Sequence, residues 1–295
     1  MKTTGIPRFI IGVSAAALVG LSLLIPAPAN AAHEMIYAVD TGNNLINFWS
    51  DAPQNVINSY NINGLLGLSE EIRGIDYFGG AIYGLGSSSR LYTIDPNTGL
   101  ATAVSPLQFS PLLNGQTFGV DNSSAGFQVV SGLGGGQSML VNRATGVATL
   151  EPNLNYVAGD PFFSVLPRVD ALAYDAASGT WYAADTLQNT LVGFNPATGG
   201  LSTIGMLGID PSRFNGMDNS QFTGIMYLGT PAASSDPQAN LYWVNKATGM
   251  ASLIGQIGQP GDDYLIRGLT VVPEPTSVVL LAMGAVGLLF ARRRQ

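Results

Sequence analysis

The stretch LYTIDPNTGLATAV (Leu91–Val104) surrounds a proline and a glycine with Asp, Asn and Thr, between two short apolar runs. Variants of its centre recur: IDPNTGLAT begins at Ile94, VNRATGVAT at Val141, FNPATGGLS at Phe194 and VNKATGMAS at Val244. Their glycines, Gly99, Gly146, Gly199 and Gly249, are separated by 47, 53 and 50 residues. An Asp or Asn that caps a turn, followed by a glycine that accepts positive φ, is typical of a tight turn between two strands. The motif therefore predicts repeated hairpins rather than copies of one active site.

A second shared element lies upstream of each turn. IRGIDY (from Ile72), TFGVDN (from Thr117), VDALAY (from Val169) and FTGIMY (from Phe222) are centred on the small residues Gly74, Gly119, Ala171 and Gly224. A further short strand, such as AIYGLG at Ala81, separates the two elements, so each unit has four antiparallel strands in about 50 residues. No part of the body has a convincing helical period. Units of this kind predict a β-propeller; a solenoid fits less well because its repeats are usually shorter or helical.

The two ends of the body complete one more unit. LIRGLTVV (Leu265–Val272) copies the first element with no later strands, whereas the segment from Met35 has the later strands without the first. Joined, they form a fifth blade whose innermost strand comes from the C-terminus, and this closure hides sheet edges. The sequence predicts an all-β, five-bladed propeller over residues 32–272, with six blades or an incomplete ring as the alternatives.

Residues 1–31 predict a signal peptide. Lys2 and Arg8 precede an apolar run from Phe9 to Ile25, and Ala29 and Ala31 fit a small-residue cleavage site. The apolar run is short and ends in prolines, which favours a cleaved signal over an uncleaved anchor.

The last residues, 273–295, have three parts in order. Pro273, Glu274 and Pro275 break the chain, an apolar run extends from Thr276 to Phe290, and the cluster Arg292, Arg293 and Arg294 follows. The apolar run is shorter than the roughly 20 residues that usually cross a bilayer. The arginines would keep the extreme end on the cytoplasmic side. We expect a transient inner-membrane anchor, with a permanent tail anchor as the alternative.

This tail closely resembles the PEP-CTERM sorting signal of exopolysaccharide-producing Gram-negative bacteria. The resemblance implies that a membrane protease-transpeptidase, exosortase, recognises Pro273, Glu274 and Pro275 and removes the tail. It implies that Arg292, Arg293 and Arg294 stop transfer across the membrane, and that the protein reaches the cell surface or extracellular matrix.

The body resembles a second bacterial family, catalogued as domain of unknown function 4394, which is often seen with PEP-CTERM tails. The resemblance spans Ile36 to Val272 and rests on IYAVD at Ile36, on RGIDY at Arg73 and on the D/N-x-x-T-G turns. It implies no established activity.

Composition excludes several kinds of chemistry. The body has seven basic and eighteen acidic residues, which disfavours nucleic-acid binding. The chain has no cysteine, and its one histidine, His33, lies next to the expected cleavage site. Cysteine nucleophiles, Cys/His metal clusters and disulfides are thereby excluded, and we predict no catalytic residues.

Charged residues flank the small central residue of each first element. The preceding positions hold Arg73, Phe118, Asp170, Thr223 and Arg267, and the positions two residues after it hold Asp76, Asp121, Ala173, Met226 and Thr270. The two positions are three residues apart, so their side chains point to opposite faces of the strand unless a β-bulge lies between them. We take Arg73, Asp170 and Arg267 as candidate ligand-binding residues at the channel mouth, for an anionic sugar or carboxylate. Interblade salt bridges are the alternative, which the sparseness of charge favours.

Metal binding has little support in the sequence. Ca²⁺ is conceivable at the oxygen-rich segments 40–44 and 261–263, but neither has EF-hand spacing, and solvated turns fit both better. We therefore predict no metal or other cofactor.

Two functions fit these observations. The first is a non-catalytic binding or adhesion module of the cell surface or matrix, associated with exopolysaccharide or biofilm. The second is a secreted propeller hydrolase resembling metal-dependent lactonases, with Asp76, Asp121, Asp170 and Asn122 as its raw material. The blades do not supply acidic residues at one equivalent position, and no histidine base is present to activate water, so the first function is favoured.

Overall fold

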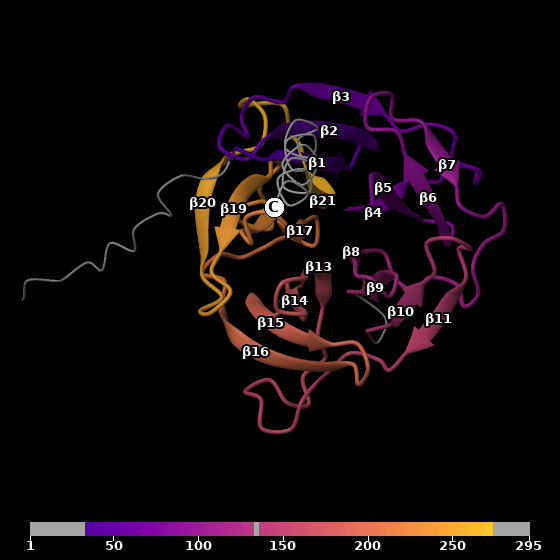
Figure 1. Cartoon of the computed structure of the whole chain (residues 1–295). Helices are drawn as coiled ribbons and strands as arrows, with labels where there is room; N and C mark the ends of the chain where they lie inside the picture. Colours follow the sequence, from indigo (N-terminus) through magenta and orange to yellow (C-terminus); the bar gives the residue numbers. More distant parts are fainter. Residues whose placement is uncertain (1–32, 133–135, 274–295) are drawn as a thin grey trace, which may run out of the picture. The chain divides into compact units, whose positions relative to one another are not determined.

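The computed structural model describes residues 33–132 and 136–273, and every named element in these ranges is a β-strand. The strands form five small sheets arranged in a ring, with the chain passing from one sheet to the next (Figure 1). The fold is a five-bladed β-propeller, as the repeats predicted.

Blade I consists of β21 (Ile266–Val272), β1 (Met35–Asp40), β2 (Asn44–Trp49) and β3 (Asn58–Asn61), from the axis outward. Blade II consists of β4 (Ile72–Phe78), β5 (Ala81–Gly86), β6 (Arg90–Ile94) and β7 (Ala101–Ala103). Blade III consists of β8 (Phe118–Asn122), β9 (Phe127–Ser131), β10 (Ser138–Val141) and β11 (Ala148–Glu151).

Blade IV consists of β13 (Val169–Asp175), β14 (Thr180–Asp185), β15 (Thr190–Asn195) and β16 (Gly200–Met206), with the short β12 (Asn155–Tyr156) added in parallel at its outer edge. Blade V consists of β17 (Gly216–Asn219), β18 (Met226–Thr230), β19 (Asn240–Val244) and β20 (Ala251–Gln256).

The repeated turn joins the third and fourth strands of blades II to V. Gly99, Gly146, Gly199 and Gly249 all have φ between 70° and 80°. In the first copy, the Asp95 carboxylate accepts a hydrogen bond from the Asn97 N–H at 2.8 Å, and Asn142, Asn195 and Asn245 make the equivalent bond. The turn is therefore built by the local chemistry that its sequence indicates.

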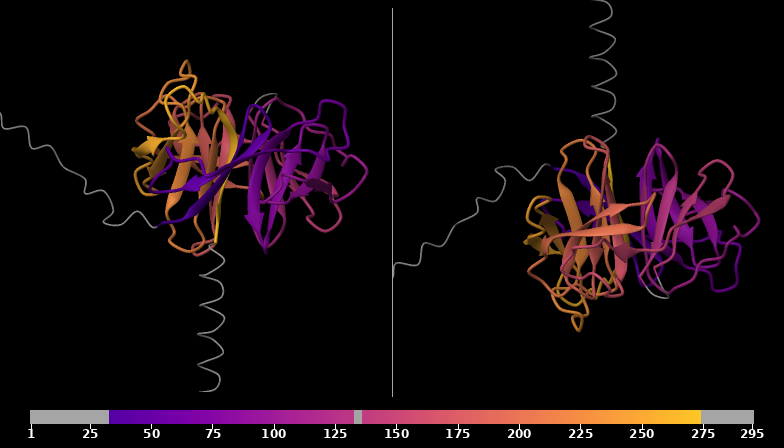
Figure 2. Two further views of the ribbon diagram at one scale, coloured as in Figure 1. Left: turned by 90° about the horizontal axis from the view of Figure 1, so that it is seen from above. Right: turned by 90° about the horizontal axis from the view of Figure 1, so that it is seen from below.

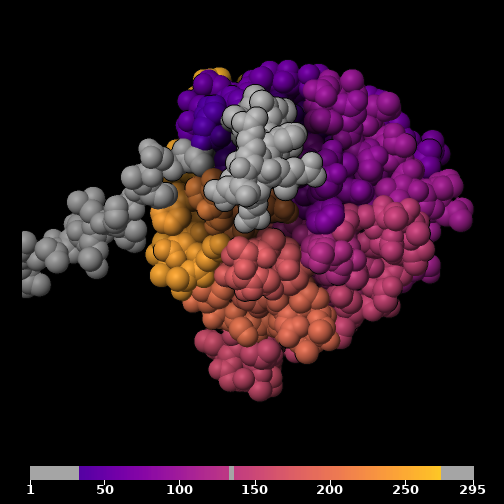
Figure 3. Space-filling model, viewed as in Figure 1, coloured from indigo at the N-terminus to yellow at the C-terminus, as the bar shows by residue number. Residues whose placement is uncertain are grey.

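Blade I closes the ring. Strand β21 pairs antiparallel with β1, with Met35 opposite Val272, so the two ends of the body lie in one sheet. Figure 3 shows the indigo surface of the first strands beside the yellow surface of the last ones. The described residues carry their own core, because five apolar clusters each lie between two neighbouring blades.

The five innermost strands pack closely around the axis at their small central residues. At four of these five positions the residue is glycine, and a larger side chain would not fit. A Cβ added to Gly216 would lie 2.4 Å from the Leu269 nitrogen, and one added to Gly268 would lie 2.7 Å from the Ile75 nitrogen. Gly119 meets the backbone of Ala171 in the same way, and Gly74 meets the Val120 side chain. Equivalent positions are therefore adjacent, and the inner strands all run from one face of the ring to the other (Figure 2).

The sequence assignment of one inner strand was wrong. The sequence pattern predicts FTGIMY as the inner strand of blade V, but that strand is β17, with Gly216 as its small residue, while Met226 begins the second strand. Gly224 and Thr223 instead lie in the turn between them, where Gly224 has φ 70°. Only Met226 and Tyr227 of FTGIMY belong to a strand, and Phe222 is exposed in the turn before it.

Substituting Gly216 by Ala is expected to lower the free energy of unfolding by about 1–3 kcal/mol, because the added methyl must displace backbone at the axis. The control is Gly193→Ala in β15, where a Cβ would lie 3.8 Å from the nearest atom. Urea denaturation of both variants measures the difference. Equal stability of Gly216→Ala and wild type would show that the inner strands are not packed this tightly.

Candidate functional site

Three candidate residues lie at β-bulges at the start of inner strands. The strand register skips Arg73 between Ile72 and Gly74, and it skips Asp170 and Arg267 in the same way. A bulge places an extra residue in the strand and changes the direction of its side chain. Arg73 and Arg267 line one hollow at this end of the ring, and Asp170 joins Arg267 in an adjoining hollow. We call this region the arginine mouth.

Arg73 and Arg267 share a single carboxylate. Glu71 Oε2 lies 3.1 Å from Arg73 Nη2 and 2.9 Å from Arg267 Nη1. The second contact is an ion pair without hydrogen-bond alignment, because the buried Nε and Nη1 atoms of Arg267 have no hydrogen-bond partner among the described residues. Burial lowers the pKa of Arg267, an effect that Glu71 opposes and Arg73 reinforces. The mouth thus combines two cations with one acid.

Aromatic rings and a third arginine complete the mouth. The buried ring of Phe118 and the partly buried ring of Phe214 line the same hollow as the arginines. Arg213 is exposed, and its guanidinium lies 5.2 Å from the centroid of the Phe214 ring. Among the described residues, Arg213 forms no salt bridge, so its charge adds to that of the mouth.

Asp170 is held within the protein rather than facing a partner arginine across the mouth. Its carboxylate accepts hydrogen bonds from the hydroxyls of Thr117, at 2.5 Å, and Thr186, and it lies 3.5 Å from Arg168 Nε. Burial raises the pKa of Asp170, and these three neighbours oppose that rise. Asp170 therefore fixes the wall of the mouth.

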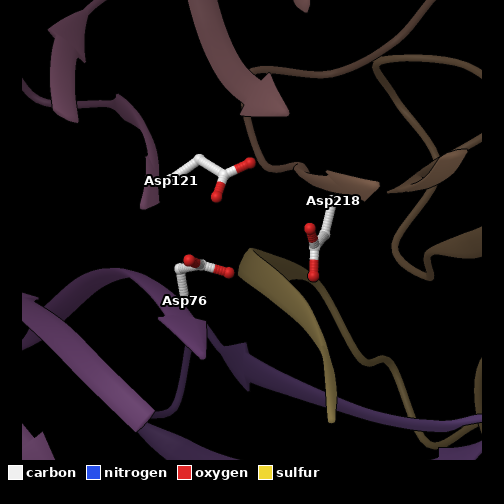
Figure 4. A group of neighbouring side chains, drawn as sticks. All are labelled: Asp76, Asp121 and Asp218. Atoms are coloured by element: carbon white, nitrogen blue, oxygen red, sulfur yellow. The ribbon is translucent and has the colours of Figure 1, made fainter. Parts of the chain in front are cut away.

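The opposite ends of the inner strands carry a group that the sequence did not reveal. Asp76, Asp121 and Asp218 occupy the same position in blades II, III and V, two residues after the axial glycine. Their carboxylate oxygens lie within 4.8 Å of one another. Figure 4 shows the three side chains turned toward a shared space from three strands. We call this group the carboxyl triad.

Each carboxyl of the triad also ties its blade to the next one. Asp76 accepts the Asn122 N–H at 2.9 Å, Asp121 accepts the Tyr174 N–H, and Asp218 accepts the Val271 N–H at 2.6 Å. In blade I, the Thr270 hydroxyl takes the same role and accepts the Tyr77 N–H at 2.9 Å. Ala173 of blade IV has no acceptor for such a bond. Side chains at one strand position therefore join four of the five blade junctions.

The triad cannot be fully ionised as it stands. The Thr270 hydroxyl lies 2.9 Å from Asp76 Oδ1 and 3.1 Å from Asp218 Oδ2, yet it has one proton and already accepts the Tyr77 N–H. Burial raises the pKa of all three carboxyls, and their mutual repulsion raises that of Asp121 and Asp218 further; Asp218 reaches about 8. The folded triad therefore keeps protons at neutral pH.

Cations lie near the triad without neutralising it. Arg143 Nη1 donates to Asn122 Oδ1 at 2.9 Å and to the Ser123 carbonyl, and Lys246 Nζ bonds to Asp175 at 2.7 Å. Both cations come from the repeated turn, at the position that is proline in the other two copies. Three carboxylate oxygens would suit a hard cation such as Ca²⁺, but that ion takes 6–8 oxygens and backbone donors already occupy part of this set.

The loops considered for calcium have turn geometry instead. Asp40 accepts hydrogen bonds from the backbone and side-chain amides of Asn44, and Asp262 accepts one from the Gln259 N–H. Both carboxylates are thus used within their own turns.

Sequence reasoning missed Asp218 because it placed the central small residue of blade V at Gly224, eight residues after Gly216. The stretch Gly216-Met217-Asp218-Asn219 matches Gly119-Val120-Asp121-Asn122 at three of four positions, and this likeness could have found it. The inference that the blades lack acidic residues at one equivalent position was therefore wrong. The structure also separates the proposed hydrolase set: Asp76, Asp121 and Asn122 lie together, while Asp170 lies at the other end of the ring.

Fold, closure and sites define a five-bladed propeller whose two faces carry different charged groups. Over residues 44–270 the chain matches the family described as a domain of unknown function (DUF4394), and it belongs to that family. Residues 271–295 match the PEP-CTERM protein-sorting motif. That motif is recognised by exosortase, and it directs export to the cell envelope or surface.

Similar solved structures include two proteins of unknown function and one complex. The protein from Bacteroides caccae is 8% identical, with 82% of this chain and 100% of that chain covered and a TM-score of 0.45. The protein from Bacteroides thetaiotaomicron is 14% identical, with 76% of this chain but 58% of that chain covered and a TM-score of 0.46. A chain of a nidogen/laminin complex is 9% identical, with 82% and 99% covered and a TM-score of 0.48. No curated protein matches this chain.

Several sequence predictions fall outside the described residues. These are the signal peptide (1–31), the sorting residues Glu274, Pro275, Arg292, Arg293 and Arg294, and the apolar run from Thr276 to Phe290; Pro273 is described as the residue after β21. Within the described ranges, no helix is long and apolar enough to cross a membrane.

The stability of the ring is expected to fall as pH rises from about 4 to 8. In this window the folded triad retains protons that the unfolded chain has released, because the Asp218 pKa rises from 3.8 to about 8. Asp218→Asn keeps an oxygen for the Val271 N–H but removes the titration, so its melting temperature should depend less on pH. Thermal melts in EDTA between pH 4 and 8 measure this.

Asp160→Asn provides a control of opposite sign. Burial alone would raise the Asp160 pKa, but hydrogen bonds from Thr203 and Phe162 lower it below 3.8. Its contribution to stability is thus lost as pH falls, and this variant should leave the slope between pH 5 and 8 unchanged. A wild-type slope identical to that of Asp218→Asn would contradict the proton-holding triad.

Proposed function

We propose that this protein is a non-catalytic binding module of the cell surface or extracellular matrix, which exosortase sorts in a Gram-negative bacterium and which associates with exopolysaccharide or biofilm. One observation carries the proposal: two arginines at the mouth share one carboxylate, and two buried guanidinium nitrogens of Arg267 have no hydrogen bond to any described residue. In a body with seven basic and eighteen acidic residues, this arrangement favours an anionic ligand.

The position of the mouth supports display on a surface. Strand β21 begins beside Arg267 at the mouth and ends at Val272, so Pro273 follows at the opposite face. Pro273 thus lies at the face that carries the carboxyl triad, and the mouth lies at the far end of the inner strands.

The burial of the triad supports a role other than catalysis. Asp76, Asp121 and Asp218 are 3%, 2% and 7% exposed, so a substrate has no direct access to these carboxyls. The lactonase-like alternative is favoured only by the grouping of Asp76, Asp121 and Asn122. Stoichiometric Ca²⁺ binding with lactone turnover, abolished by Asp121→Asn, would replace our proposal by that alternative.

Sorting should depend on the Pro-Glu-Pro motif. Replacing Pro273, Glu274 and Pro275 by alanines is expected to leave an unprocessed chain in the membrane fraction, because exosortase loses its recognition residues. Immunoblots of membrane, surface and medium fractions measure mass and location. Wild-type processing of this variant would remove the assigned role of the motif, and a variant with Ser277 replaced by Ala controls for changes to the tail in general.

Binding to extracellular polymer should depend on the mouth. The double variant Arg73→Ala/Arg267→Ala is expected to bind polymer extracted from the producing bacterium at least tenfold more weakly, because it loses charge-assisted hydrogen bonds. Co-sedimentation with that polymer measures the loss. Arg143→Gln removes a cation at the opposite face and should bind like the wild type. Unchanged binding by the folded double variant would exclude the mouth as the site.

A further inference from the structure

The arginine mouth combines three features that together select a class of ligand. The first is an incompletely paired guanidinium: among the described residues, the buried Nε and Nη1 of Arg267 form no aligned hydrogen bond, although Nη1 lies 2.9 Å from Glu71 Oε2. Unpaired buried donors cost free energy, so a group that accepts from them gains affinity. The ligand therefore brings an acceptor, and the adjacent charge of Arg73 favours an anionic one.

The second feature indicates a carboxylate. One oxygen of Glu71 already lies 3.1 Å from Arg73 Nη2 and 2.9 Å from Arg267 Nη1, so the two guanidinium groups converge at carboxylate distance. Glu71 is partly exposed, with 36% of its side chain accessible, and can move aside or remain as a neighbour. A ligand carboxylate could then occupy the same meeting point of the two arginines.

The third feature is an apolar wall beside polar groups. The rings of Phe118 and Phe214 line the hollow, and the exposed Gln116 amide lies on its rim. Aromatic rings stack against the C–H face of a sugar ring, and an amide can bond its hydroxyls. The hollow is shallow, because its empty space of about 240 Å³ includes open solvent. A ligand therefore lies against this surface rather than inside an enclosed pocket.

We propose that the arginine mouth binds a terminal uronic acid, with the carboxylate on Arg73 and Arg267 and the sugar ring against Phe214. This inference rests on the proposed function and names the ligand class of the same site. It distinguishes a carboxylated sugar from a neutral sugar, a simple carboxylate and an inorganic anion.

The test uses protein comprising residues 33–273, which contain all five cores. Calorimetric titrations with glucuronate and galacturonate are compared with glucose, galactose, acetate and inorganic sulfate. We expect at least one uronate to bind, neutral sugars to give no heat, and acetate and sulfate to bind at least tenfold more weakly. Acetate or sulfate binding as strongly as the uronates would overturn the proposal.

Variants separate the charge from the ring. Arg267→Gln is expected to weaken uronate binding at least tenfold, and Arg143→Gln, a charge-matched change at the opposite face, to leave it unchanged. Phe214→Ala is expected to weaken uronate binding while acetate binding stays the same. Equal losses with Arg267→Gln and Arg143→Gln would reveal nonspecific charge attraction and refute the site. Melting temperatures show which variants are folded.

The outcome also distinguishes this inference from the function on which it rests. If wild-type protein binds extracted polymer through Arg73 and Arg267 but binds neither uronate, the ligand class is wrong and the binding function stands. If it binds no polymer, the proposed function fails whatever the small molecules do.

Discussion

The close approach of five inner strands at the axis is the constraint on which the rest of the structure depends. At Gly119, Gly216 and Gly268 a Cβ would lie less than 3 Å from the backbone of the neighbouring strand. Small residues here bring the strands together, and the apolar clusters between neighbouring blades are buried as a result. Because the equivalent positions of the five inner strands are adjacent, a small residue at this position permits close packing in every blade.

The arginine mouth and the carboxyl triad lie only three residues apart along an inner strand, a distance of about 10 Å. Before the small residue, bulges turn Arg73, Asp170 and Arg267 toward the mouth. After it, Asp76, Asp121 and Asp218 accept backbone N–H groups of the next blade. The mouth is partly exposed and has N–H donors that form no hydrogen bond to the described residues. The triad is buried, and its carboxyl oxygens already accept backbone N–H groups. The first suits a ligand, and the second suits the closure of the ring.

The two alternatives considered for the arginines are both partly present. Arg267 does form an interblade ion pair, but its partner is Glu71 of blade II, which Arg73 also contacts. One acid between two cations satisfies neither guanidinium fully. The sharing leaves the mouth positive within an acidic body, and this local difference from the net charge is the basis of the binding proposal.

The sequence by itself determined the features that depend on local backbone chemistry. Asp95, Gly99 and the equivalent residues of the other three copies specified the turns. The spacing of these turns specified the blades. The fifth unit, divided between the two ends of the body, specified the closure of the ring. The sequence also named Arg73 and Arg267 of the mouth, but not Arg213. The tertiary structure placed β17 rather than FTGIMY at the axis, because Gly216 fits against the backbone of β21 whereas Thr223 and Gly224 lie in the turn before β18. It also decided that Asp76, Asp121 and Asp218 form one group, since residues 45 and 97 positions apart along the chain meet only when the ring closes.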